Sequence, residues 1–181
     1  MKTIKLGIVA LSCALLAACL SAQKPASAEV AVGQAGGLVV GTYDSRAIAV
    51  AYVASDAFRE KMRKLYAELA EAKKKGDEEL VASLEALGPA MQAEIHKQGF
   101  GTAPVGNILA GMEQQLSEIA STAAVDLIVS KWTLDYQSES ARFVDVTSFL
   151  VAEFEPSKKT LKTIKELRRR SPVPASDLEN H

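Results

Sequence analysis

Three stretches of the chain place apolar residues at the spacing of a helix. The first begins at Ser55 or Asp56 and ends before Gly76, the second follows Asp77, and the third runs from Val105 to Ala123. Apolar residues three or four positions apart share one face, so each stretch predicts an amphipathic helix. Only Gly76 and Asp77 separate the first two, which predicts an antiparallel helical hairpin.

Proline and glycine interrupt this pattern at two places. Gly88 and Pro89 lie inside the second stretch, where proline removes a backbone donor, so we expect a kink or a break. Residues 98–106 contain three glycines and Pro104, which predicts a loop.

Short runs typical of strands lie on either side of the helical stretches. Residues 38–43 predict a strand, and residues 46–54 predict a short buried helix, with a strand as the alternative. Residues 126–130 predict a buried strand, and the alternation over 132–136 predicts its hairpin partner.

The remaining residues predict helices after this hairpin. Residues 137–142 are a polar loop, Asp145 or Thr147 can cap a helix through Phe154, and Pro156 opens a last helix. Helices segregated from a small three-stranded sheet built from the two chain ends predict an α+β fold.

The N-terminus has the pattern of an export signal. Lysines precede an apolar run over residues 6–20, which is too short to span a bilayer. The run ends in Leu16-Ala17-Ala18-Cys19, which resembles the bacterial lipobox and implies a lipid anchor on Cys19, with residues 1–19 as signal. Residues 20–37 predict a flexible tether. The alternative is cleavage after Ala28, which would release a soluble periplasmic or secreted protein.

Composition limits the chemistry of the folded part. The chain is 48% apolar and 24% charged, as in ordinary globular proteins. Loss of Lys2 and Lys5 with the leader leaves 19 basic and 22 acidic residues, so no nucleic-acid partner is expected. Both cysteines, Cys13 and Cys19, lie in the leader, so the domain can form no disulfide.

The sequence offers no catalytic or metal-binding pattern. Its two histidines, His96 and His181, are far apart, and no nucleophile, zinc or phosphate-loop motif occurs. We therefore predict a protein without enzymatic activity, cofactor or metal.

Two groups of residues are candidates for binding. The first is a possible binding surface after the predicted strands, formed by Tyr43, Asp44, Arg46, Trp132 and Tyr136. The structural interpretation is that Asp44 or Ser45 caps a helix, Arg46 pairs with a carboxylate, and the aromatic residues pack in a hairpin or a subunit contact. The second is a basic helix over residues 157–170, ahead of a frayed tail at 171–181. It either contacts an anionic surface or is a solvated face, and its cations are Lys158, Lys159, Lys162, Lys165, Arg168, Arg169 and Arg170.

Residues at both ends of the domain resemble one known family. Residues 38–46, Leu-Val-Val-Gly-Thr-Tyr-Asp-Ser-Arg, and residues 125–130, Val-Asp-Leu-Ile-Val-Ser, followed by Tyr136 and by Asp145-Val146-Thr147, resemble the Skp/OmpH-like periplasmic chaperones. This resemblance implies a domain over residues 38–156, with a helical hairpin inserted into a small sheet. It also implies a homo-trimer joined through the sheets, with helical arms that enclose unfolded outer-membrane proteins.

The sequence differs from that family in its short arms, which carry both signs of charge, and in its lipid anchor and basic last helix. From the whole sequence we predict an envelope lipoprotein that binds other proteins, with unfolded envelope proteins as clients. The alternative is a structural or scaffolding lipoprotein that contacts the membrane or cell wall through residues 157–170.

Overall fold

The computed structural model describes residues 37–178, all of which belong to one unit of the chain, residues 35–181. The predicted leader with its lipidation site at Cys19, nearly all of the predicted tether, and His181 lie outside the described residues.

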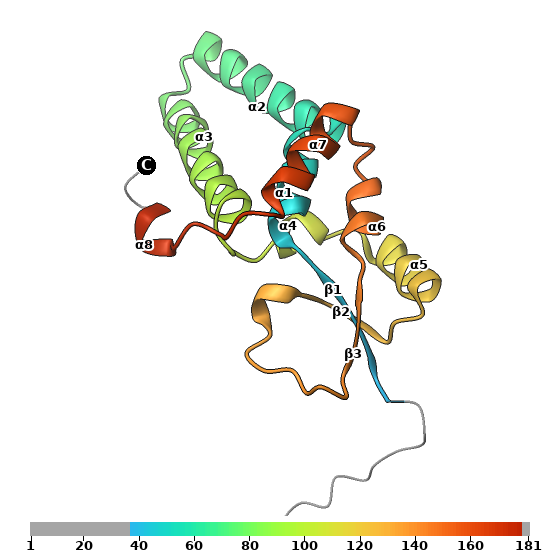
Figure 1. Ribbon diagram of the computed structural model, residues 1–181. Helices are drawn as coiled ribbons and strands as arrows, with labels where there is room; N and C mark the ends of the chain where they lie inside the picture. The colour runs from blue at the N-terminus through green and yellow to red at the C-terminus, as the bar shows by residue number, and fades with distance from the viewer. Residues whose placement is uncertain (1–36, 179–181) are drawn as a thin grey trace, which may run out of the picture. The chain divides into compact units, whose positions relative to one another are not determined.

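Three parallel strands form the sheet (Figure 1). Strand β1 (Val39–Tyr43) lies in the centre, between β2 (Leu127–Ser130) and β3 (Arg142–Asp145). Gly41 pairs with Ile128 on one side and with Val144 on the other. One strand comes from the start of the domain and two from its end, with helices between them. The predicted α+β fold is therefore confirmed.

The first three helices begin and end where the sequence predicts. Helix α1 (Ser45–Val53) is capped by Asp44, α2 (Asp56–Lys75) by Ser55, and α3 (Glu78–Gly99) by Asp77. Each cap side chain accepts a hydrogen bond from a backbone N–H of the first turn, which a helix cannot otherwise satisfy. Gly76 ends α2 at φ 71°, a conformation that glycine adopts at little cost. The hairpin of α2 and α3 is thus a consequence of local sequence.

The structure corrects two helix predictions, the possible break at Pro89 and the single third helix. Helix α3 continues through Pro89 without a break. Pro89 and Glu85, whose carbonyl loses its donor, are both exposed, so water can replace the missing bond. The third stretch forms two helices, α4 (Gly106–Leu109) and α5 (Glu113–Ala123), because Gly111 turns the chain between them at φ 87°.

The predicted hairpin over residues 132–136 does not form. Lys131–Thr133 is a single 3-10 turn, η1, and the third strand lies at Arg142–Asp145, next to the predicted loop. The reason is topological: β2 and β3 both run parallel to β1, and parallel strands cannot be joined by a tight turn. Residues 131–141 therefore carry the chain back along the sheet.

The last three helices close the domain. Helix α6 (Thr147–Ala152) follows β3, and α7 (Lys158–Leu167) begins after Ser157 and packs against α1. The predicted frayed tail is ordered as far as it is described. It forms α8 (Ala175–Leu178) against α3, and the Val173 N–H donates to the Phe100 carbonyl at 2.9 Å.

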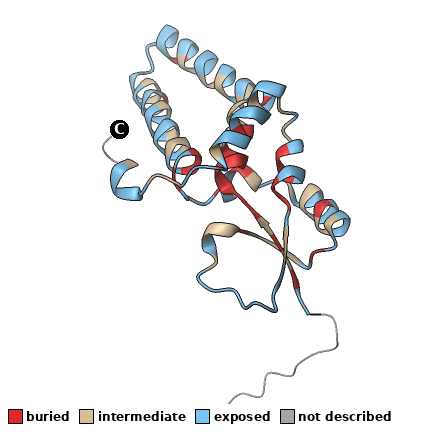
Figure 2. Ribbon diagram, in the orientation of Figure 1, coloured by how far each residue is buried: buried red, intermediate tan, exposed pale blue. Residues whose placement is uncertain are grey.

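The hydrophobic core lies on one face of the sheet (Figure 2). Val39 and Tyr43 of β1 point into it, together with fully buried residues of α1 and α6 such as Ile48 and Leu150. Strand β2 and the residues just before it approach so closely here that β1 favours a glycine. A Cβ on Gly41 would lie 3.1 Å from Val125 Cγ2 and 3.2 Å from Ile128 Cγ1.

The opposite face of the sheet contributes nothing to this core. Alternation along the strands places six side chains there: Asp145 at the end of β3 is exposed, and five are half-buried, namely Val40, Thr42, Leu127, Val129 and Phe143. The core contains none of them. Four of the six are apolar, so a mainly hydrophobic sheet face is left partly open to solvent.

Candidate functional site

A buried ion pair lies directly after β1. Asp44 has no exposed surface and Arg46 is 1% exposed. The guanidinium donates to both carboxylate oxygens, from Nη2 to Oδ2 at 2.9 Å and from Nε to Oδ1 at 3.1 Å. The Arg46 backbone N–H also donates to Oδ1. The cap that the sequence left open between Asp44 and Ser45 is therefore Asp44, and Asp44 also supplies the carboxylate expected to pair with Arg46.

Groups from the end of β2 complete the cluster. Lys131 Nζ lies 2.8 Å from Asp44 Oδ2, and Trp132 Nε1 donates to Oδ1 at 3.3 Å. The indole ring lies beneath both cations, 4.9 Å from the Arg46 guanidinium carbon and 4.3 Å from Lys131 Nζ. These contacts fix the beginning of the segment that joins β2 to β3.

The cluster also contacts α6 and the residues that follow α7. Arg46 Nη1 donates to the Arg170 carbonyl at 2.9 Å, and the Asp44 N–H donates to Thr147 Oγ1 at 3.0 Å. One aspartate thus connects β1, α1, the β2–β3 segment and the start of α6, and through Arg46 it reaches the residues after α7. Such a satisfied polar network specifies one arrangement of these elements.

Opposing effects set the pKa of Asp44. Burial alone would raise it, but hydrogen bonds and positive charge from Arg46 and Lys131 lower it from 3.8 to about 2. The pKa of Asp145 is also lowered. Burial raises the pKa of Asp145, but hydrogen bonds from Thr147 and Arg168 lower this pKa by more. Burial raises the pKa of Tyr43, which faces the core.

Acid should therefore destabilise the domain through Asp44. A carboxyl whose pKa is lowered on folding stabilises the fold above its unfolded pKa, and this stabilisation is lost as the pH falls through the folded pKa. We expect about 2 kcal/mol of the free energy of unfolding to disappear between pH 4 and pH 2. Urea titrations at several pH values, followed by Trp132 fluorescence, measure it. A free energy of unfolding that stays constant over this range would contradict the proposed role of Asp44.

The residues predicted as a binding surface do not form one. Tyr43, Asp44 and Arg46 are almost completely buried, and Trp132 is half-buried over the ion pair. Tyr136 is 84% exposed, and within residues 37–178 no hydrogen bond or ring contact joins it to the cluster. The structure brings Asp44, Arg46 and Trp132 together as a fold-defining cluster, and it leaves Tyr136 apart.

Two of the domain's cavities lie outside the ion pair of Asp44 and Arg46, and the first of them is lined in part by Lys131 and Thr147 of the same cluster. One, of about 590 Å³, is a groove between α6 and α7; the other, of about 580 Å³, lies between α1, α3 and α7. Asp44 and Arg46 line neither. The second cavity is lined mainly by apolar side chains and by His96, whose ring packs edge-on against Phe100. Among the described residues, no three His, Cys, Asp or Glu side chains are placed to hold a metal.

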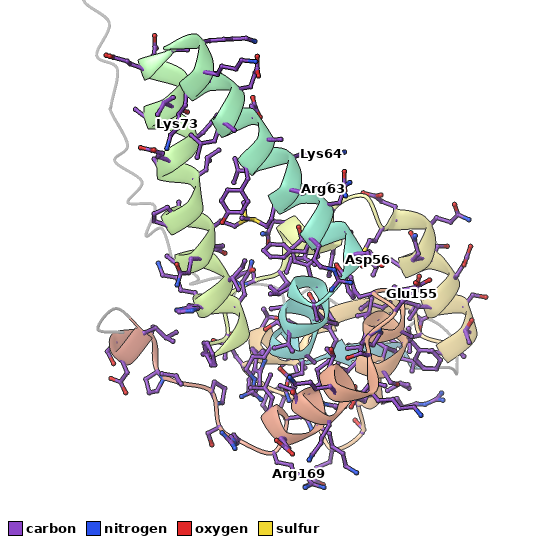
Figure 3. The ribbon with its side chains drawn as sticks, turned by 90° about the horizontal axis from the view of Figure 1, so that it is seen from above. Asp56, Arg63, Lys64, Lys73, Glu155 and Arg169 are labelled. Atoms are coloured by element: carbon purple, nitrogen blue, oxygen red, sulfur yellow. The ribbon has the colours of Figure 1, made fainter. Side chains whose placement is uncertain are left out.

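The α2–α3 hairpin leaves much of its apolar surface uncovered. Only Ala72 of α2 is buried, and in α3 Leu84, Gln98 and Gly99 are. Most other apolar positions facing the partner helix are half-buried, while Tyr66 is 63% and Leu87 46% exposed. The two helices meet at their connecting turn, diverge toward the rest of the domain, and extend away from the sheet (Figures 1 and 3). Near the turn, Lys73 joins them through an ion pair of 2.8 Å with Glu85.

The basic residues of the last helix belong to the folded domain. All seven predicted cations are exposed, but Ile164 on the same helix is 6% exposed and packs in the core. Arg168 pairs with Asp145, and Lys162 lies 4.0 Å from Glu166. Residues 157–170 are therefore not a separable helix, and truncating them would remove core contacts and the carbonyl that Arg46 binds.

The groove between α6 and α7 was not predictable from the spacing of residues. The sequence shows the cations of α7, but only the packing of α7 beside α6 shows that Lys165, Arg168 and Arg169 line a cavity together with Lys131. Within the described residues, no helix is long and apolar enough to cross a membrane. No family model, curated protein or solved structure gives a significant match to this chain.

Proposed function

We propose that this protein is an exported envelope lipoprotein that binds other proteins and holds unfolded envelope proteins through its α2–α3 hairpin. The observation that carries the proposal is the uncovered apolar surface of that hairpin. Its helices contain 20 and 22 residues, yet only Ala72, Leu84 and two residues at the end of α3 are buried.

This surface has the properties that a protein-holding surface needs. Unfolded chains expose apolar side chains, and contiguous apolar patches on a folded protein mark interaction sites. Met62 and Met91 of the hairpin are half-buried, and methionine adapts to irregular partners. Charged residues of both signs cover the outer side of α2, where Arg63 and Lys64 point away from α3 (Figure 3). They would keep the arm soluble without a client.

A homo-oligomer is part of the proposal. Parallel sheets are normally covered on both faces, whereas here the face with Val40, Leu127, Val129 and Phe143 is only half-buried. Further copies of the chain can cover it when the open faces of three subunits meet around a three-fold axis. We propose a trimer, in keeping with the resemblance of both domain ends to the Skp/OmpH-like family.

The proposed location rests on the leader. Acylation of Cys19 after removal of the signal would attach the protein to a membrane facing the periplasm, with residues 20–37 as tether. The folded domain would then act at the membrane surface, where exported proteins emerge unfolded.

Aggregation of an unfolded outer-membrane protein tests the proposal. The client is diluted from urea with and without residues 29–181, and light scattering is followed with time. We expect aggregation to slow at near-equal molar amounts, because the hairpin covers apolar segments of the client. Serum albumin at equal mass controls for the non-specific effect of added protein on aggregation. Scattering as fast as in the albumin control would refute holding.

A further inference from the structure

We infer that the groove between α6 and α7 binds the C-terminal end of a peptide, with its free α-carboxylate and an apolar last side chain. The inference rests on the proposed protein-binding function and names a second, sequence-selective contact with the partner.

The groove has apolar walls. Val151 of α6 faces Leu161 and Ile164 of α7, and Pro156 lies at the turn between the helices. Leu161 is 46% exposed, so one wall is open to a ligand and is not sealed into the core. The cavity of about 590 Å³ falls in the range of sites that hold small ligands and short peptide segments.

Positive charge is concentrated on the α7 side of the groove. Four cations line it, and two of them already have partners: Lys131 binds Asp44, and Arg168 pairs with Asp145. Lys165 and Arg169 are exposed, and neither side chain forms an ion pair with any other residue of 37–178. Two unpaired cations next to an apolar wall complement a carboxylate that is carried by an apolar residue.

The opposite end of the groove favours a peptide over a lipid. Glu155 lines that end, and Figure 3 shows Glu155 and Arg169 at opposite ends of this part of the molecule. The acyl chain of a lipid has no hydrogen-bond donor for the Glu155 carboxylate, whereas a peptide backbone has N–H donors along its length. Ser148 on α6 supplies a further hydroxyl to the lining. A peptide C-terminus meets these groups with its carboxylate at Lys165 and Arg169 and its preceding amides toward Glu155.

Binding of matched peptides tests the inference. Fluorescent hexapeptides that end in leucine, as free acid or as C-terminal amide, are titrated with residues 29–181, and anisotropy is measured. We expect the acid to bind at least about tenfold more tightly than the amide. Lys165→Gln with Arg169→Gln should remove this preference. Lys158→Gln with Lys162→Gln, on the same helix but outside the groove, should keep it, and Leu161→Asp should weaken both peptides.

The outcomes separate this inference from the proposed function. Equal affinity for acid and amide, or a preference that survives Lys165→Gln with Arg169→Gln, would overturn it. Binding to vesicles containing phosphatidylglycerol that this double variant loses, with no preference for the acid peptide, would assign the groove to lipid headgroups and also overturn it. If the acid preference is found but client aggregation is not slowed, only the proposed holding function fails.

Discussion

Replacement of Asp44 by asparagine is expected to lower the free energy of unfolding by about 3–5 kcal/mol, because it leaves Arg46 buried without a counter-charge. Asp44 has no exposed surface, and its carboxylate is the only acidic group that the described residues place on the Arg46 side chain. Asparagine keeps the shape and the α1 cap but cannot neutralise the two adjacent cations. Urea unfolding, with circular dichroism as the signal, measures the loss.

The exposed ion pair of Asp145 and Arg168 provides the matched control. These side chains are 54% and 34% exposed, so water already screens their interaction. Asp145→Asn should cost at most about 1 kcal/mol. An equal loss of stability in the two variants would show that burial of the Asp44 cluster has no special importance for the fold.

Introduction of a lysine at Val129 is expected to abolish the proposed trimer. Val129 is half-buried on the open face of the sheet, where a contact between copies would surround it with apolar groups. A charge there would be desolvated on assembly without a partner, at a cost of several kcal/mol per subunit. Light scattering after size exclusion should give three chain masses for the unchanged protein and one for the variant.

A lysine on an exposed helix position controls for the added charge. Thr122→Lys on α5 changes the net charge equally and lies away from the open face, so it should leave the assembly intact. If the unchanged protein has the mass of a single chain, the open sheet face is not a contact between copies. The fold would stand, but a cavity shared by several hairpins would be excluded.

The sequence predicted the elements whose causes are local. Helix α2 begins after Ser55 and ends before Gly76 because a capping hydroxyl and a left-handed glycine act within one turn. The same holds for α3 after Asp77 and for α7 after Ser157. A cap at Asp44 or Ser45 and a carboxylate partner for Arg46 were also predicted, but the sequence did not identify Asp44 as both.

The elements that depend on distant residues were not predictable. Whether residues 132–136 pair with β2 or turn away depends on β1, which lies about ninety residues earlier in the chain and takes both β2 and β3 in parallel. The contacts of Lys131 and Trp132 with Asp44 span a similar separation. The prediction of a binding surface was wrong for the same reason. Polar residues after a strand can form either an exposed site or a buried ion pair, and the sequence does not show which.

The structure divides its polar and apolar groups between two roles. The cluster around Asp44 is buried and stabilises the junction of sheet and helices, whereas the hairpin, the open sheet face and the α6–α7 groove remain available to partners. Substitutions in the first should act on stability. Substitutions in the others should act on binding.

The most direct test of the account is the aggregation assay with a hairpin variant. Tyr66→Ser with Leu87→Ser removes the two most exposed apolar side chains of the hairpin, and because both are exposed the free energy of unfolding should change by less than about 1 kcal/mol. The control, Tyr136→Ser with Phe149→Ser, removes two exposed aromatic side chains elsewhere. We predict that the hairpin variant loses most of its effect on client aggregation while the control retains it. Equal protection by both variants would contradict a holding function of the hairpin.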